Sequence, residues 1–344
     1  MELDLSHKPA AHCENGATSA LLRYNGIDLS EPMIFGLASG LWFSHVPFVK
    51  MGGMPVTSFR TYPGVLFSRI TKLLGIKTET QRFLSKENAM RKLDSLLMEQ
   101  LTPVGCVVGM YYLPYAPKEY RFHFNGHNIC IIGKDEATGI YSVLDTNATE
   151  KVTISYKDLV KVRFPKGGVY PLMGQMYWIK SVPEQLPDLN PIIIKSIIAT
   201  CRNMTSQPWM KPWFGTRGIS LLSKRIRTWE ATMGRRGAIL NLAQVIRMLE
   251  EIGTGGAGFR FIYGAFLQEA AAKTGFDILN EYAMRITEIG DQWRNFAYRG
   301  SRIIKKRNGE TYTFNDLGNL LEDIGNQEHT FFLDLQKTAL SLPR

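Results

Sequence analysis

Three side chains that could act together in covalent chemistry lie in the first half of the 344-residue chain: Cys13, His127 and Asp145. A thiol becomes a strong nucleophile when a base removes its proton, and histidine is the usual base near neutral pH. A carboxylate can orient that base and favour its charged form. We therefore expect Cys13 to attack, His127 to take and return a proton, and Asp145 to hold the imidazole.

Cys13 lies at the predicted start of a helix. Between residues 15 and 24 apolar side chains recur at helical spacing, and Gly26 follows where a left-handed cap would end the helix. The unpaired N–H groups and the positive dipole end at a helix start stabilise a thiolate. Free cysteines are also often small buried apolar residues, and this helix alone does not exclude that interpretation for Cys13.

Two predicted strands bring the other two residues together. His127 opens the run HNICIIGKD, Asp145 closes GIYSVLDT, and residues 135–139 have the composition of a hairpin turn. Antiparallel pairing would place His127 and Asp145 at the same end of a sheet, and a helix carrying Cys13 would complete the group. A structural role for the histidine is the alternative. Asn147 is the other candidate for the third member.

The composition is that of an ordinary folded protein, with 44% hydrophobic and 21% charged residues. The segment MELDLSHKPA lacks the basic start and apolar run of a signal peptide, and no apolar segment is long enough for a membrane span. Four scattered cysteines without a CxxC pair indicate reduced thiols, no disulfide framework and no zinc motif. We therefore expect a cytoplasmic protein with no membrane contact and no bound metal.

A change of pattern at SVPEQLPDLNP predicts a domain boundary. Before it, strand-like runs alternate with short helices that Ser30 and Ser85 would cap. After it, long stretches of helical periodicity follow one another. The run GTGGAGF at 253–259 lacks the preceding strand and the lysine of a phosphate loop, so we expect it to connect two helices. We predict a mixed α+β domain over 1–185 and a helical domain over 186–344.

Much of the net charge of +10 lies in one stretch. Between residues 202 and 247, nine Lys or Arg accompany one acid, Glu230. A solvated basic face is one interpretation, and an acidic protein partner is the other. Nucleic acid is disfavoured because no helix-turn-helix, zinc-finger or RNP-like motif is present. The nine are Arg202, Lys211, Arg217, Lys224, Arg225, Arg227, Arg235, Arg236 and Arg247, and the candidate contact residues are Lys224, Arg225, Arg227, Arg235 and Arg236.

Longer segments around these residues resemble a known family. HCENGATSALLRYNG followed by LSEPMIFGLASGLWF, and the later GGAGFRFIYGAFLQEAA and EIGDQWRNFA, resemble the butirosin biosynthesis protein H-like family over nearly the whole chain. The helix-start cysteine followed by GHNICIIGKD and YSVLD also resembles papain-like cysteine peptidases, especially the C39-like group. The resemblance implies a papain-like α+β fold with an added, mostly helical C-terminal domain.

The same resemblance implies an activity. The implied activity is that of an acyltransferase of secondary-metabolite biosynthesis. Such an enzyme moves an aminoacyl group from the phosphopantetheine thioester of an acyl carrier protein to a small amine. Cys13 would carry the acyl group, His127 would be general base and acid, and Asp145 would orient it. Carrier proteins are typically acidic, which agrees with the basic stretch. No bound cofactor is implied, and the oligomeric state is not indicated.

One part of the papain-like pattern is missing. Those peptidases have a glutamine shortly before the nucleophile to complete the oxyanion hole, whereas SHKPAAH precedes Cys13 here. The backbone N–H of Cys13 could be one donor. The side-chain candidates for the other are His12, Asn15 and Ser6. Glu31 is either the partner of a helix dipole or a contact for the amine substrate.

Two other functions fit the same residues. A peptidase or amide hydrolase would use the same triad with water as the acceptor. A binding protein that kept the fold and lost catalysis would account for the missing glutamine. With an acyl thioester and an amine, a hydrolase would form the free acid and an acyltransferase the amide. The reactivity of Cys13 tests whether the chain is a binding protein without catalysis.

Overall fold

A computed structural model describes residues 1–51, 53–117, 123–167, 171–205, 212–305 and 312–343. Contacts divide the chain into two units: residues 1–34 with 63–187, and residues 35–62 with 188–344. The α+β class predicted from the sequence is confirmed. Residues 35–62, which we placed with the first predicted domain, group with the second unit.

The first unit is built on an antiparallel sheet of six strands in the order β3-β8-β4-β5-β6-β7. The predicted hairpin is confirmed: β5 and β6 pair antiparallel, with Asp135 opposite Ile140 at the turn. The strands are β3 (Lys77–Gln81), β4 (Val104–Gly109), β5 (Asn125–Asp135), β6 (Ile140–Leu144), β7 (Val152–Ser155) and β8 (Met176–Ser181).

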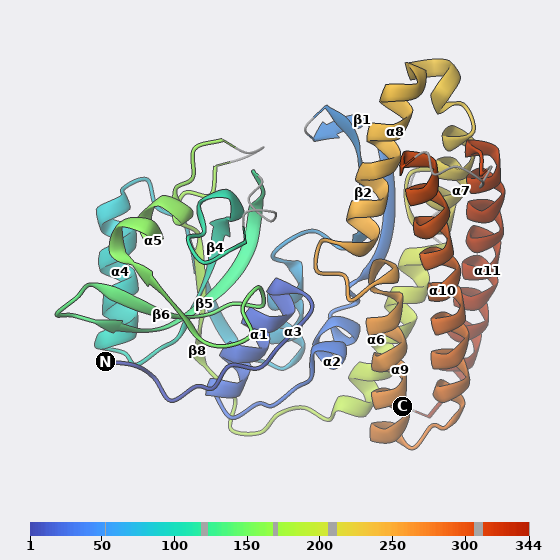
Figure 1. The fold of residues 1–344 in the computed structure, drawn as a ribbon. Helices are drawn as coiled ribbons and strands as arrows, with labels where there is room; N and C mark the ends of the chain where they lie inside the picture. Colours follow the sequence, from blue (N-terminus) through green and yellow to red (C-terminus); the bar gives the residue numbers. More distant parts are fainter. Residues whose placement is uncertain (52, 118–122, 168–170, 206–211, 306–311, 344) are drawn as a thin grey trace. The chain divides into compact units, whose positions relative to one another are not determined.

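Helices cover both faces of this sheet (Figure 1). On the face covered by α4 and α5, Leu93 and Leu159 pack with Ile129 of β5 in one buried cluster. The other face is covered by α1 and α3. Ser85 caps α4 as predicted, accepting a hydrogen bond from the N–H of Asn88. The helices are α1 (Cys13–Tyr24), α3 (Val65–Leu73), α4 (Lys86–Met98) and α5 (Tyr156–Arg163), with a 3-10 turn η1 (Met110–Tyr112) after β4.

The second unit combines one hairpin with long helices. The predicted helix over LSEPMIFGLASGLWF is shorter than expected: α2 (Glu31–Leu37) begins in the first unit and ends in the second, before Leu41 begins a strand. Ser30 accepts the N–H of Met33 at the start of α2, as predicted. The other elements are β1 (Leu41–Met51), β2 (Met54–Arg60), α6 (Leu189–Thr205), α7 (Gly215–Ile226), α8 (Trp229–Glu250), η3 (Ala257–Phe259), α9 (Arg260–Thr274), α10 (Ile278–Lys305) and α11 (Phe314–Ser341).

Aromatic packing joins the hairpin of the second unit to its helices. Phe43 of β1 and Phe59 of β2 meet edge to face at 5.2 Å, and both contact the ring of Trp293 in α10. The guanidinium of Arg260 lies over the rings of Phe59 and Trp293 and forms a fully buried ion pair with Glu328, with Nε and Oε1 2.8 Å apart. The glycine run GTGGAGF separates α8 from α9, as expected from the sequence.

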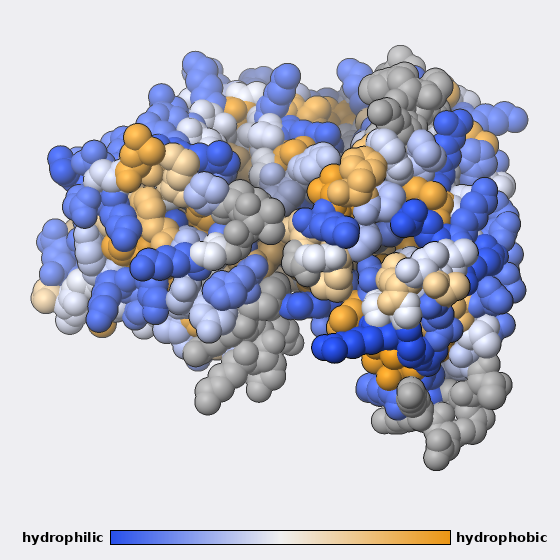
Figure 2. Space-filling view, turned by 90° about the horizontal axis from the view of Figure 1, so that it is seen from above, coloured by the Kyte–Doolittle hydropathy of each residue, from blue (hydrophilic) through white to orange (hydrophobic). Residues whose placement is uncertain are grey.

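Hydrophilic side chains predominate on the face of the molecule in Figure 2, with hydrophobic ones scattered among them. Among the helices in the described part of the chain, none combines the length and the apolar character that crossing a membrane requires.

Candidate active site

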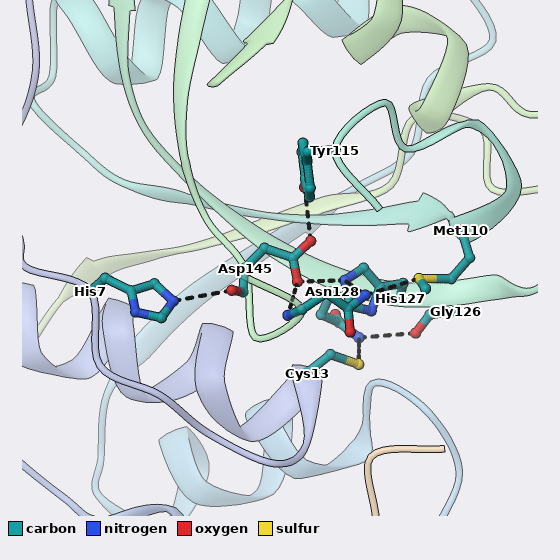
Figure 3. Close-up of polar contacts among 9 residues, drawn as sticks. His7, Cys13, Met110, Tyr115, Gly126, His127, Asn128 and Asp145 are labelled. Atoms are coloured by element: carbon teal, nitrogen blue, oxygen red, sulfur yellow. Dashed lines mark hydrogen bonds and ion pairs between the residues drawn. The ribbon is translucent and has the colours of Figure 1, made fainter. Parts of the chain in front are cut away.

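Cys13 is the first residue of α1, as the sequence predicted. His12 precedes it in extended conformation as the N-cap, and its Nδ1 accepts the N–H of Asn15 at 3.4 Å. The Cys13 side chain is half-buried and forms no disulfide. Because α1 packs against β5, the thiol lies beside the strand that carries His127 (Figure 3).

His127 and Asp145 are in direct contact at the end of the β5–β6 hairpin. Nε2 of His127 lies 2.8 Å from Oδ1 of Asp145, and both side chains are buried. An ionised carboxylate can only accept a hydrogen bond, so Nε2 carries the proton in this pair. Nδ1 is then the ring nitrogen that remains to interact with Cys13. The predicted proximity of His127 and Asp145 is confirmed.

Asp145 is held by further contacts on both sides of its carboxylate. The Tyr115 hydroxyl donates to Oδ2 at 2.8 Å, and the backbone N–H of Asn147 donates to Oδ1 at 2.9 Å. Nε2 of His7 lies 3.1 Å from the Asp145 carbonyl oxygen (Figure 3). The carboxylate is thereby fixed in the orientation that meets the imidazole.

The electrostatics of the pair favour its charged form. Burial by itself lowers the pKa of His127, but the Asp145 carboxylate and Cys13 outweigh burial and raise that pKa to about 10. Burial raises the pKa of Asp145, and the imidazole together with hydrogen bonds from Asn147 and Tyr115 outweighs burial and lowers it. At neutral pH the site therefore holds an imidazolium next to the sulfur, which is the charge that stabilises a thiolate.

Gly16 allows α1 to approach the turn that carries Asp145. A Cβ at position 16 would lie only 2.4 Å from Cγ2 of Thr146, a separation that real Cβ atoms do not show. Glu14 fixes the same helix from another side, since its Oε1 accepts the N–H of Leu66 at 2.9 Å. The position of Cys13 relative to Asp145 thus depends on the residues that follow it in α1.

Glu31 holds the segment that precedes the cysteine. Its Oε2 accepts the N–H of Ala11 and its Oε1 accepts the N–H of His12, each at 2.8 Å. Nδ2 of Asn15 also donates to Oε1 at 3.3 Å. Burial raises the pKa of Glu31, and these hydrogen bonds oppose that effect. The contacts give His12, Asn15 and Glu31 a structural role at the start of α1, while Ser6 is exposed.

Asn147 supports Asp145 and does not replace it. Its side-chain Nδ2 lies 3.4 Å from Nε2 of His127, further than the 2.8 Å of the Asp145 oxygen. Its backbone N–H donates to that same carboxylate oxygen. Of the two candidates for the third member, Asp145 has the geometry to orient the imidazole.

Asn128 lies beside Cys13 and was not identified from the sequence. Its Nδ2 is 3.8 Å from the Cys13 sulfur (Figure 3). Along β5, alternation places Asn128 on the same face as Cys130, which is the face that α1 covers. The run HNIC contains this alternation, but no local pattern indicates which face a helix more than a hundred residues earlier in the chain will cover.

The candidate basic residues do not all remain available for a partner. Nη2 of Arg227 pairs with Glu322 of α11 at 2.7 Å and also donates to Asn319. Arg235 pairs with Glu230 in the first turn of α8. Arg227 therefore links the end of α7 to α11, whereas the Arg235 pair lies within α8, and both charges are largely neutralised.

Three basic side chains in the same region are exposed. Lys224 and Arg225 lie in the last turn of α7, and Arg236 lies in α8. Within the described ranges, no ion pair joins any of the three to an acid. We call Lys224, Arg225 and Arg236 the basic patch. Lys211, another member of the predicted basic stretch, lies outside the described residues.

Comparison with known proteins gives two family matches. Residues 12–146 match a family described as "Butirosin biosynthesis protein H, N-terminal". Residues 157–335 match a family described as "Domain of unknown function (DUF4872)". No curated protein matches the chain in a sequence search. The first match contains Cys13, His127 and Asp145.

Proposed function

Because the chain belongs to the butirosin biosynthesis protein H-like family, we propose that it is a biosynthetic acyltransferase acting in the formation of an antibiotic or related secondary metabolite. The proposed donor is the phosphopantetheine thioester of an acyl carrier protein, and the proposed acceptor is a small amine. The observation that carries the proposal is the contact of a helix-start thiol with a buried imidazolium–carboxylate pair inside the matched domain.

In the first half of the proposed reaction, the Cys13 thiolate attacks the thioester carbonyl carbon. A carbon–sulfur bond forms, and the π pair of the carbonyl moves onto oxygen. Collapse of this intermediate expels the donor thiolate, which takes the proton from His127. One thioester has replaced another, so the step costs little free energy.

In the second half, the amine attacks the acyl-enzyme carbonyl and gives its proton to His127. Collapse releases the amide and returns Cys13 as a thiolate beside the imidazolium. Asp145 keeps the imidazole in one orientation through both halves. The starting charges are restored, so the cycle needs no other reactant.

The papain-like interpretation of the first unit is part of the same proposal. A thiol at the start of a helix, an imidazole on a strand of an antiparallel sheet and a carboxylate on the next strand end are its supporting features. The missing glutamine before Cys13 is the departure from that pattern. Another amide, that of Asn128, lies next to the thiol.

The direct test is acylation of Cys13 by an aminoacyl-pantetheine thioester, followed by intact and peptide mass spectrometry. We expect one acyl group on Cys13 in the wild-type chain and none in Cys13→Ala. Cys201→Ala is the matched control, because Cys201 is a buried thiol of the second unit. Absence of any acyl-enzyme with several aminoacyl and acyl thioesters would reject the proposal.

The acceptor is tested by adding amines to the acylated protein. Formation of an amide, with little free acid, is the expected result for an acyltransferase. Free acid as the main product with every amine would identify a thioester or amide hydrolase. A wild-type thiol that neither acylates nor alkylates faster than Cys13 in unfolded protein would instead indicate a binding protein.

We also propose that the basic patch contacts an acidic carrier protein. Exposed charges steer association and lose their effect as salt rises. The test is carrier-protein binding by Lys224→Glu with Arg225→Glu, at low and at high ionic strength. Lys273→Glu with Lys337→Glu is the matched control, because both lysines are exposed on the same unit. We expect weaker low-salt binding only for the patch variant, and equal binding by both variants would contradict this contact.

A further inference from the structure

The amide of Asn128 is held in one orientation next to the candidate nucleophile. Its Nδ2 donates to the carbonyl oxygen of Gly126 at 3.2 Å and lies 3.8 Å from the Cys13 sulfur. Its Oδ1 accepts the hydroxyl of Tyr177 at 2.9 Å. The carbonyl of Gly126 can only accept a hydrogen bond, so the amide nitrogen must lie on that side. One N–H is left to point toward the sulfur (Figure 3).

Tyr177 keeps the amide in this position. The ring is buried and packs on Phe67 with 4.6 Å between ring centroids. Gly105, on the neighbouring strand, makes room for it, since a Cβ there would lie 2.3 Å from the tyrosine ring. Burial raises the pKa of Tyr177 well above its ordinary value, so the hydroxyl stays protonated and donates to Asn128.

We propose that Asn128 is an oxyanion-hole donor of the Cys13 acyl-transfer reaction and that Tyr177 is its positioning residue. The inference rests on the proposed function. When the Cys13 sulfur bonds to the carbonyl carbon, the π pair moves onto the carbonyl oxygen. That oxygen is bonded to the same carbon as the sulfur, so the negative charge develops two bonds away from the sulfur. A donor close to the sulfur can therefore reach this oxygen, and a preorganised donor in a dry site stabilises the charge that develops there.

Asn15 and His12, the other candidates considered from the sequence, take part in the contacts at the start of α1. Nδ2 of Asn15 donates to Glu31, and Nδ1 of His12 accepts the N–H of Asn15. His127 points its Nε2 at Asp145 and has the proton-transfer role. In papain-like peptidases a glutamine shortly before the nucleophile in the sequence is the side-chain amide donor. Here Asn128 of β5 would supply that amide.

Two reactions of the same thiol separate an oxyanion donor from a residue that acts on the thiolate. Acylation by a thioester passes through an oxyanion, whereas alkylation by iodoacetamide displaces iodide and forms none. We expect Asn128→Ala to slow Cys13 acylation by about 10²–10³-fold, the effect of losing one oxyanion-hole donor. Its alkylation rate at pH 7 should stay close to that of the wild type.

Two further variants make the test specific. Tyr177→Phe keeps the ring and removes only the hydroxyl, so we expect a smaller fall in acylation, about tenfold, with unchanged alkylation. This variant also serves if Asn128→Ala does not fold. Asn125→Ala is the matched control, because Asn125 is a buried amide of the same strand that donates to Gly167. It should acylate at the wild-type rate.

The possible results divide clearly. Equal falls in acylation and alkylation would show that Asn128 acts on the thiolate, and this would overturn the oxyanion role. Wild-type acylation rates in both Asn128→Ala and Tyr177→Phe would overturn it while leaving the proposed function intact. A wild-type chain that forms no acyl-enzyme at all would overturn both.

Discussion

The imidazole of His127 and the carboxylate of Asp145 form a buried ion pair with 2.8 Å between Nε2 and Oδ1. Asp145→Asn would keep an oxygen that can accept from Nε2 but remove the charge. We expect the pKa of His127 to fall from about 10 by about one to three pH units. An NMR pH titration of labelled histidines measures this change directly, with the exposed Asp28→Asn as control.

The same variant should also slow the chemistry. Loss of a well-oriented general base and acid typically reduces a rate by about 10²–10⁴-fold, which sets the upper range for Asp145→Asn. The measurement is the rate of acyl-enzyme formation at pH 7. A His127 titration that does not move in Asp145→Asn would show that the carboxylate does not set the charge of the imidazole.

Stability should depend on pH through this pair in a defined direction. The pKa of His127 is raised in the folded chain, so its contribution is complete below about 6.5 and is lost as pH rises through about 10. The pKa of Asp145 is lowered by folding, so its contribution is present above its ordinary value of 3.8 and is lost as pH falls below it. The pair therefore stabilises the folded protein most between about pH 3.8 and about pH 6.5.

Urea unfolding of the wild type and of the double variant His127→Gln with Asp145→Asn measures this contribution. The difference in free energy of unfolding between the two proteins should be largest near pH 5–6 and should shrink toward pH 10. A difference that grows between pH 6.5 and pH 10 would contradict the raised pKa of His127.

The arrangement of His127 and Asp145 could be predicted from the sequence because it is local. The turn at residues 135–139 brings the ends of the two strands together, although the ladder does not pair the two residues directly: Cys130 lies opposite Leu144, so Asp145 follows the last residue of β6 and reaches His127 diagonally. The helix start at Cys13 was likewise predictable from the apolar spacing that follows. Contact between the helix and the hairpin was expected only from the chemistry that the three residues share.

What could not be predicted depends on long-range packing. Asn128 and Tyr177 are 49 residues apart, and their hydrogen bond depends on β8 pairing with β4. Similarly, the apolar pattern of the hairpin over 41–60 does not show which of the two units the hairpin packs in. It groups with the second unit because Phe43 and Phe59 pack against Trp293, about 230–250 residues later in the chain.

Glu31 offers a test of whether the segment before Cys13 must be held in place. Glu31→Ala removes the acceptor of two backbone N–H groups, so it should lower the free energy of unfolding by about 1–3 kcal/mol. Hydrogen exchange at Ala11 and His12 should become faster. Acylation of Cys13 should slow as the start of α1 loosens.

The control for Glu31 is Glu184→Ala, because Glu184 is exposed. The free energy of unfolding of Glu31→Gln should lie between those of Glu31→Ala and Glu184→Ala, since an amide has one acceptor oxygen where the carboxylate has two. If Glu31→Ala keeps wild-type stability and amide exchange but loses turnover of amines, the substrate contact considered from the sequence would be the better interpretation of this residue.

Gly16 tests how closely α1 must approach the turn after β6. In a helix, alanine is ordinarily more stable than glycine by about 1 kcal/mol. Here the added Cβ would lie 2.4 Å from Cγ2 of Thr146, so Gly16→Ala should instead destabilise the protein by about 1–3 kcal/mol and slow acylation. Thermal unfolding and the acylation rate are the two measurements.

A second substitution identifies the cause. Thr146→Ser removes the methyl group that the new Cβ meets and keeps the hydroxyl. The double variant Gly16→Ala with Thr146→Ser should therefore recover much of the stability and acylation rate, with a coupling energy of about 0.5–3 kcal/mol in the cycle. Additive effects would show that another contact, such as the one with Ala10 at 3.2 Å, limits the approach of α1.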